Sequence, residues 1–143
     1  MNWYLKVIKQ YADFGGRARR KELWMFVLVN MIISNALLAL ENVLGITAFN
    51  FVDIAMFLGN MPEATAFYLY GNMGFGWLYL IYNVALLLPS FAVGVRRFHD
   101  IGKSGWHYLV GLIPLVGVIL LLVWFCKDSQ AGANKWGANP KEK

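Results

Sequence analysis

The residues best suited to act on a substrate are His99 and Asp100, which are adjacent in the polar run RRFHDIGKSG. An adjacent His-Asp pair is typical of metal-dependent phosphohydrolases, but such a site needs further histidine and carboxylate ligands. His107 is the only other histidine, and it stands at the mouth of a predicted membrane span. We therefore expect no metal site, no catalytic residue and no enzymatic activity. Instead, Asp100 should pair with Arg96 or Arg97 or cap a turn, while His99 supplies a hydrogen bond.

Two further patterns would indicate cofactor or redox chemistry, and both are incomplete. Gly102-Lys103-Ser104 matches the end of a phosphate-binding P-loop, but the consensus needs a glycine where this chain has Arg97 and a β-strand before the loop. The triplet fits a tight turn better, with Ser104 available as a helix cap. Cys126 is the only cysteine, so neither an internal disulfide nor a cysteine cage for zinc or iron–sulfur can form. We expect no cofactor.

The basic residues are the one group in the sequence whose side chains together could form a binding site. A guanidinium grips phosphate through two parallel hydrogen bonds, so such a face suits the headgroups of anionic membrane lipids, an acidic segment of a membrane-protein partner, or self-association. The alternative is that the charges only set the topology of the helices. Nucleic acid is not expected, because the basic residues stand beside predicted membrane ends. The candidate binding residues are Arg17, Arg19, Arg20, Lys21, Arg96, Arg97, His99, Asp100, Lys103 and Trp106.

The elements that must position these residues are helices in a membrane. Of 143 residues, 59% are hydrophobic and 15% charged, with a net charge of +5 and a mean hydropathy of +0.50. This composition is too apolar for a soluble domain of that length. We predict an all-α, multi-pass membrane protein forming a single domain over 1–143. Three apolar stretches, 23–44, 77–95 and 106–126, are each long enough to cross a hydrocarbon core of roughly 30 Å.

The distribution of charge predicts the orientation. Lysine and arginine are absent from 45–76 but concentrated before the first span and in the connector 96–105. By the positive-inside rule, the connector and the N-terminus are cytoplasmic and 45–76 is extracytoplasmic. In residues 2–14, polar side chains recur at helical spacing, and aliphatic and aromatic side chains occupy most of the remaining positions. This pattern predicts an amphipathic helix. This helix either lies in the membrane interface or packs on the protein's own spans.

The third stretch, 106–126, allows two topologies. Pro114 and Gly117 interrupt it, so it either crosses the membrane with a bend or turns back as a re-entrant hairpin. A hairpin would keep the basic tail 127–143 cytoplasmic, whereas the length of the stretch favours a crossing. We expect three crossings and a tail that is irregular and exposed.

A subunit of an oligomeric channel or transporter for small solutes is the alternative function. Transport generally needs polar or ionisable groups at the depth of the membrane centre. The spans offer only uncharged polar side chains there, and Glu41 stands near an outer end. Such polar residues are expected to join helices by hydrogen bonds. They are Asn30, Ser34, Asn35, Asn83 and Ser90.

Several motifs in order resemble the small bacterial inner-membrane proteins known as domain of unknown function 805. The resemblance covers most of the chain and rests on FGGRARRKELW (14–24), RRFHDIGKSGW (96–106), Ile113-Pro114 with Gly117, and GANKWGANP (132–140). The chain departs from the family pattern at Leu23, Phe98 and His107, and 45–76 carries no family motif. The resemblance implies a multi-pass location in the bacterial inner membrane. It implies no established activity, substrate or cofactor.

Overall fold

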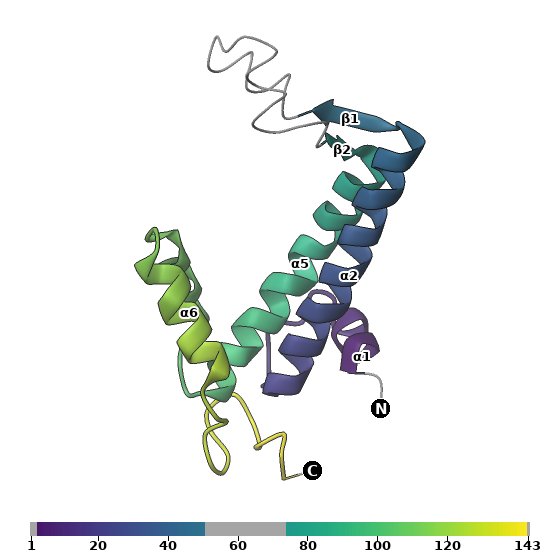
Figure 1. Ribbon diagram of the computed structural model, residues 1–143. Coiled ribbons are helices and arrows are strands. Elements are labelled where there is room, and N and C mark those ends of the chain that lie inside the picture. Colours follow the sequence, from purple (N-terminus) through teal and green to yellow (C-terminus); the bar gives the residue numbers. More distant parts are fainter. Residues whose placement is uncertain (1–2, 51–73, 143) are drawn as a thin grey trace. The chain divides into compact units, whose positions relative to one another are not determined.

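The computed structural model describes residues 3–50 and 74–142, and these are mostly helical (Figure 1). The elements are α1 (Trp3–Lys9), α2 (Arg20–Leu44), β1 (Thr47–Asn50), β2 (Gly74–Gly76), α5 (Trp77–Asp100), the 3-10 helix η1 (Gly105–Leu112) and α6 (Val116–Cys126). Two helices, α2 and α5, are long and apolar enough to cross a membrane, and α6 is a shorter apolar helix. The predicted class, a helical membrane protein, is confirmed. Most of the predicted extracytoplasmic segment 45–76 lies outside the described residues.

The chain forms two compact units that are not successive in sequence. One unit comprises 30–86, and the other comprises 1–29 together with 87–143. Both long helices therefore contribute to both units, and a single domain over 1–143 stays a prediction. Large apolar side chains on these helices are open to their surroundings, with Val43 84% and Val84 65% exposed. Such faces are suited to lipid contact.

Within the unit 30–86, polar side chains join α2 to α5. The Tyr82 hydroxyl donates to Asn30 Oδ1 at 2.8 Å, and the Ser34 hydroxyl donates to Asn83 Oδ1 at 3.3 Å. Asn35 instead donates to the carbonyl of the preceding turn of its own helix. The expected role of these residues, hydrogen bonding between apolar helices, is confirmed for Asn30, Ser34 and Asn83.

Glu41 closes the far end of the same unit. Its side chain is 1% exposed, and its carboxylate accepts backbone N–H groups of Gly76 at 3.1 Å, Leu78 at 2.7 Å and Tyr79 at 3.3 Å. These donors belong to the start of α5, where backbone N–H groups have no partner inside the helix. A carboxylate from α2 thus caps α5, and the helix dipole favours negative charge there. A Cβ on Gly76 would overlap this carboxylate, so a larger residue there would displace the Glu41 side chain from its bonds.

The stretch 106–126 does not form one continuous helix. It divides into η1 and α6, separated by a break at which Leu115 adopts a positive φ of 61°. The two helices pack closely and run in opposite directions. A Cβ on Gly117 would overlap the Val110 carbonyl oxygen, and near the open end of the hairpin the rings of Tyr108 and Phe125 lie 6.3 Å apart. The structure therefore has a helical hairpin in place of one continuous helix at 106–126, and the number of membrane crossings stays a prediction.

The connector is also more ordered than expected, because α5 continues beyond the predicted end at 95 to Asp100. Gly102 then makes the turn with a φ of 77°, as its permissive backbone allows. Gly105 is required for a different reason, since a Cβ there would lie 2.8 Å from Val95 Cγ1. Ser104 occupies the N-cap of η1 but makes no side-chain capping bond.

Helix α1 is shorter than the predicted 2–14 and packs on the protein itself. Val7 is fully buried, and the Tyr4 ring stacks on Phe26 of α2 with centroids 5.7 Å apart. The Lys6 ammonium pairs with Glu22 at 2.7 Å. Of the two alternatives, packing on the protein's own helices is what the structure shows, while an interfacial location stays a prediction.

Candidate functional site

Asp100, the last residue of α5, is the centre of a buried ionic cluster. Its fully buried carboxylate accepts hydrogen bonds from Arg17 Nε at 3.1 Å, from Arg97 Nη1, and from the Ser129 hydroxyl at 2.6 Å. We call Arg17, Arg97, Asp100 and Ser129 the Asp100 cluster. The expected pairing of Asp100 with Arg97 is confirmed. A carboxylate shared by two buried guanidinium groups is the compensation that buried charge requires.

Arg17 extends this cluster into the tail. Its Nη1 donates to the carbonyl oxygen of Gly132 at 2.7 Å and of Gly137 at 3.3 Å, and its Nη2 donates to that of Gln130 at 2.6 Å. In return, the Gln130 N–H donates to the Asp100 carbonyl at 2.9 Å. The tail is irregular, as expected, but it is fastened to the helix ends and is not a free segment.

Arg97 holds the end of α6 through hydrogen bonds to backbone carbonyls, as Arg17 holds the tail. Its Nε donates to the Phe125 carbonyl at 3.3 Å, and its Nη2 donates to the Lys127 carbonyl. These carbonyls belong to the last turn of α6 and the residue after it, where helix acceptors lack partners of their own. All three nitrogens of each guanidinium, in Arg17 and Arg97, thus bond to the chain. Neither guanidinium has a nitrogen left to donate to an external phosphate, and a binding role for Arg17 and Arg97 stays a prediction.

Arg20 lies at the exposed edge of this region. It donates to the Cys126 carbonyl at 3.2 Å and lies 3.3 Å from the Asp128 carboxylate, which also pairs with Lys141. Hydrogen bonds from the Lys141 ammonium and from the Ser129 N–H lower the pKa of Asp128. Because both partners of Asp128 are largely solvated, these pairs add little to stability.

His99 and Lys103 each contact a tryptophan. The His99 ring stacks on Trp136 with centroids 4.5 Å apart and an interplanar angle of 10°, and its Nδ1 lies 3.3 Å from the Gly16 carbonyl oxygen. The Lys103 ammonium lies 4.8 Å from the centroid of Trp124. These are packing contacts that hold the tail and α6. The two other predicted residues, Lys21 and Trp106, are exposed.

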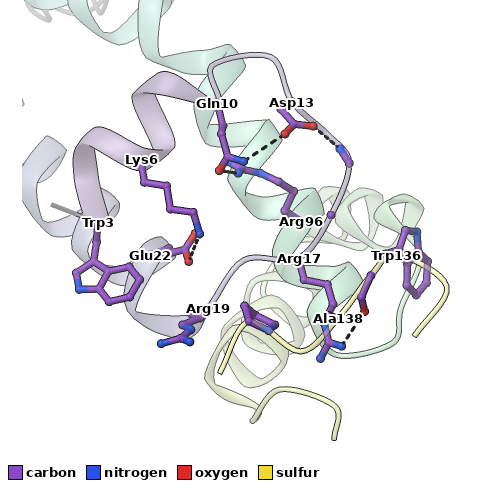
Figure 2. A pocket seen from close by; sticks show the side chains of 14 residues that line it. Trp3, Lys6, Gln10, Asp13, Arg17, Arg19, Glu22, Arg96, Trp136 and Ala138 are labelled. Atoms are coloured by element: carbon purple, nitrogen blue, oxygen red, sulfur yellow. Dashed lines mark hydrogen bonds and ion pairs between the residues drawn. The ribbon is translucent and has the colours of Figure 1, made fainter. Parts of the chain in front are cut away.

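A cavity of about 600 Å³ lies between α1, the start of α2, the end of α5 and the tail. Figure 2 shows Lys6 beside Glu22 in one part of the lining, and Gln10 beside Arg96 in another. The Arg19 guanidinium also lines it, 5.6 Å from the centroid of the Trp3 ring. We call this cavity the Arg96 pocket; it is lined by Trp3, Lys6, Gln10, Asp13, Gly15, Gly16, Arg17, Arg19, Glu22, Arg96, Trp136, Gly137, Ala138 and Pro140.

Arg96 is the buried cation of this pocket. Its side chain is 1% exposed. Its Nε donates to the Ala92 carbonyl at 3.3 Å and its Nη1 donates to Gln10 Oε1, but its Nη2 has no hydrogen-bond partner in the described part of the chain. Within 3–50 and 74–142, no carboxylate forms an ion pair with Arg96. A buried charged donor without a partner is costly, which distinguishes Arg96 from the satisfied Arg17 and Arg97.

Glu22 is the buried anion of the same pocket. It is fully buried, and its Oε1 accepts from Lys6 at 2.7 Å. Its Oε2 has no hydrogen-bond partner among the residues described. The pocket therefore contains an unpartnered donor and an unpartnered acceptor, on α5 and α2.

The charges of the lining are unequal in sign. Lys6 is paired with Glu22 and Arg17 with Asp100, which leaves Arg19 and Arg96 on the lining against the Asp13 carboxylate. The surplus is positive, which favours an anionic ligand. No group of three or more histidine, cysteine or carboxylate side chains suited to a metal ion occurs in the described residues.

Sequence reasoning placed Arg19 and Arg96 in a binding site but missed much of the pocket. For the helix 2–14 it leaves open whether the polar residues face the membrane interface or the protein; Lys6, Gln10 and Asp13 line the pocket. It predicts only an irregular, exposed tail, whereas residues 136–138 and Pro140 also line the pocket. Glu22 and this part of the tail did carry a signal, because both lie inside motifs of the family that the chain resembles.

Comparisons with known proteins agree with that resemblance. A family model described as "Protein of unknown function (DUF805)" matches residues 11–138. The chain is 39% identical to inner membrane protein YhaH of Escherichia coli K12 over 141 residues, covering 99% of this chain and 98% of that protein. It is 35% identical to inner membrane protein YhaI of the same strain, covering 99% and 97%. No solved structure matches the chain.

Proposed function

This chain belongs to the DUF805 family of proteins of unknown function, and we propose that it is a non-enzymatic inner-membrane module whose Arg96 pocket binds the phosphate of a phospholipid headgroup. The observation that carries the proposal is the buried Arg96 side chain, whose Nη2 has no partner in the described chain. A phosphate oxygen is a natural acceptor for a guanidinium N–H, and the hydrogen bond between the two is charge-assisted.

The position of the pocket supports a lipid as the source of the phosphate. Arg96 lies four residues before the end of α5, and Glu22 lies in the first turn of α2. The pocket is therefore built at the ends of the two apolar helices, next to their polar termini. In a membrane, such helix ends lie near the phospholipid headgroups. An acidic protein segment would compete for the same guanidinium.

The polar residues inside the long helices favour a binding module over a channel. Asn30, Ser34 and Asn83 are engaged in hydrogen bonds between α2 and α5 or with their own helix. Glu41 is engaged with the start of α5. These groups serve helix packing, so a solute pathway within this unit would have to break the contacts that hold it.

We also propose that α1 and the tail both lie on the cytoplasmic side. The Asp100 cluster joins Arg17 to tail carbonyls, so the segment before α2 and the tail occupy the same end of their unit. The positive-inside rule then places this basic end in the cytoplasm. The hairpin of η1 and α6 supports the arrangement, since a chain that turns back keeps both of its ends on one side.

Cysteine labelling tests this topology. In a Cys126→Ser background, single cysteines at Lys9, Ile46 and Glu142 report on exposed positions at both ends of α2 and in the tail. A membrane-impermeant maleimide added to intact cells should label only the Ile46 position, and permeabilisation should expose the other two. Labelling of the Glu142 position in intact cells would instead indicate a third crossing.

The function is tested by comparing Arg96→Lys with Arg20→Lys. Arg96→Lys keeps the positive charge but replaces the guanidinium by an ammonium, so the Nη2 donor is lost. We expect retention of phospholipid phosphate to fall about tenfold, as loss of one charge-assisted hydrogen bond implies. Arg20 is a matched control, since its side chain is 42% exposed and its contacts lie at the surface.

The measurement is mass spectrometry of lipids retained by the protein after purification into native membrane particles and exchange into detergent. Circular dichroism and thermal unfolding check that both variants are folded. Equal lipid retention by wild type, Arg96→Lys and Arg20→Lys would contradict the proposal. An acidic protein co-purifying with wild type but not with Arg96→Lys would replace the lipid with a protein partner.

A further inference from the structure

Glu22 gives the Arg96 pocket a second recognition element. Its carboxylate is fully buried, and only Oε1 is engaged, by Lys6 at 2.7 Å. Within the described chain, Oε2 accepts no hydrogen bond. A buried carboxylate oxygen is stabilised by a donor, and most strongly by a charged one. A ligand that carried only a phosphate would leave this oxygen unpaired and would be repelled by its charge.

We propose that the headgroup bound in the Arg96 pocket carries a primary amine next to its phosphate, so that the phosphate meets Arg96 Nη2 while the ammonium donates to Glu22 Oε2. The inference rests on the proposed function and names its ligand class, an aminophospholipid. Arg96 and Glu22 belong to different helices, line one cavity, and form no ion pair with each other in the residues described. Lys6 occupies only one oxygen of Glu22, so Glu22 Oε2 and Arg96 Nη2 both remain open to a ligand of mixed charge.

The volume and the remaining lining suit such a ligand. A cavity of about 600 Å³ is within the range of sites for small ligands. Arg19 lies on the same lining and adds positive charge for the phosphate, whereas Lys6 is paired with Glu22 and Asp13 acts electrostatically on Arg96. A lining that mixes both signs discriminates against ligands of a single sign, because each unmatched buried charge is a penalty.

Three phospholipids with identical acyl chains separate the contributions of the phosphate, the positive charge and the N–H donors of the headgroup. Dioleoyl phosphatidylethanolamine has a phosphate and an ammonium with N–H donors. Dioleoyl phosphatidylcholine has the same charges but no N–H donor, and dioleoyl phosphatidylglycerol replaces the amine by hydroxyl groups. The full-length protein, exchanged into nanodiscs holding equal amounts of the three, is released and its retained lipids are measured by native mass spectrometry. We expect retention of the ethanolamine lipid over the choline lipid by about tenfold, the value of one charge-assisted hydrogen bond.

Two variants assign this preference to the pocket. Glu22→Gln preserves the shape of the side chain but removes its negative charge. The ratio of retained ethanolamine lipid to choline lipid should therefore fall close to one, while total phospholipid retention persists. Asp128→Asn makes the same chemical change at an exposed carboxylate and should leave the preference unchanged. Soluble phosphoethanolamine, added as a competitor, should displace the lipid poorly if the acyl chains contribute to binding. Displacement at equal concentration would identify a soluble ligand.

The outcomes distinguish the inference from the proposed function. Equal retention of the three lipids by wild type, together with a loss of all three in Arg96→Lys, would overturn the amine but keep the phosphate site. A preference that survives in Glu22→Gln would also overturn the inference. No retention by wild type would overturn both. The wild-type preference is read without any substitution, so it tests the inference even if a variant fails to fold.

Discussion

Replacing Asp100 by alanine should lower the free energy of unfolding by about 3–5 kcal/mol, because it leaves buried cations without their counter-charge. Arg17 and Arg97 are both buried and both donate to this carboxylate. Their remaining acceptors are backbone carbonyls of the tail and of α6, which cannot neutralise a charge. The tail should therefore loosen before the rest of the protein unfolds.

Thermal unfolding in detergent and limited proteolysis of the tail measure the effect. Asp128→Ala is the control, because this carboxylate also pairs with cations but is exposed, and its loss should change stability little. Asp100→Asn keeps the acceptor oxygen and should fall between alanine and wild type, which provides a measurable variant if Asp100→Ala does not accumulate. Equal stability of the Asp100→Ala and Asp128→Ala proteins would show that the buried cluster is not a stabilising centre.

Gly117→Ala should destabilise the protein by about 1–3 kcal/mol or more, the range for overpacking a close contact. The new Cβ would overlap the Val110 carbonyl oxygen and lie 2.9 Å from its carbon and 3.1 Å from Gly111 Cα. All three are backbone atoms, so no side-chain rotation relieves the clash. Helices η1 and α6 would have to separate.

The direction of the stability change caused by Gly117→Ala tests whether 106–126 forms the hairpin or one continuous helix. If 106–126 were one continuous membrane helix, Gly117→Ala would exchange a poor helix former for a good one and would stabilise it by up to about 1 kcal/mol. Gly111→Ala is the matched control, because a Cβ there lies 2.7 Å from the mobile Cδ1 of Leu121 and 3.8 Å from its Cγ. We expect only a small loss for Gly111→Ala, measured by thermal unfolding beside Gly117→Ala. Stabilisation by Gly117→Ala would exclude the hairpin.

The long helices could be predicted from sequence because length and apolar composition alone define them. The start of α5 at Trp77 matches the prediction, and only its end is shifted, from 95 to Asp100. The shift has a physical cause. Arg96, Arg97 and Asp100 are polar enough to mark a membrane end, yet buried partners let the helix continue through them. Hydropathy reports where a membrane ends, not where a helix does.

The pairings of the site could be predicted only where they are local. Arg97 and Asp100 are three residues apart on one helix, a spacing at which side chains meet. Arg17 and Asp100 are 83 residues apart, and nothing in composition brings them together. The break within 106–126 could not be predicted for a similar reason, since a crossing and a hairpin bury the same apolar residues. The close approach of Gly117 to Val110 that accompanies the break is a tertiary contact.

The fastening of the tail by Arg17 also has a consequence for biosynthesis. Synthesis runs from the N-terminal side, so Lys6, Glu22 and Arg96 emerge long before Trp136 and the residues that follow it complete the wall of the pocket. A nascent chain that has already inserted both long helices still lacks the carbonyls that satisfy Arg17. The wall of the pocket is therefore complete only after the tail has been synthesised. A product truncated before the tail would keep the pair of Arg17 with Asp100 but lack the tail carbonyls that Arg17 binds, and its pocket would be open on that side.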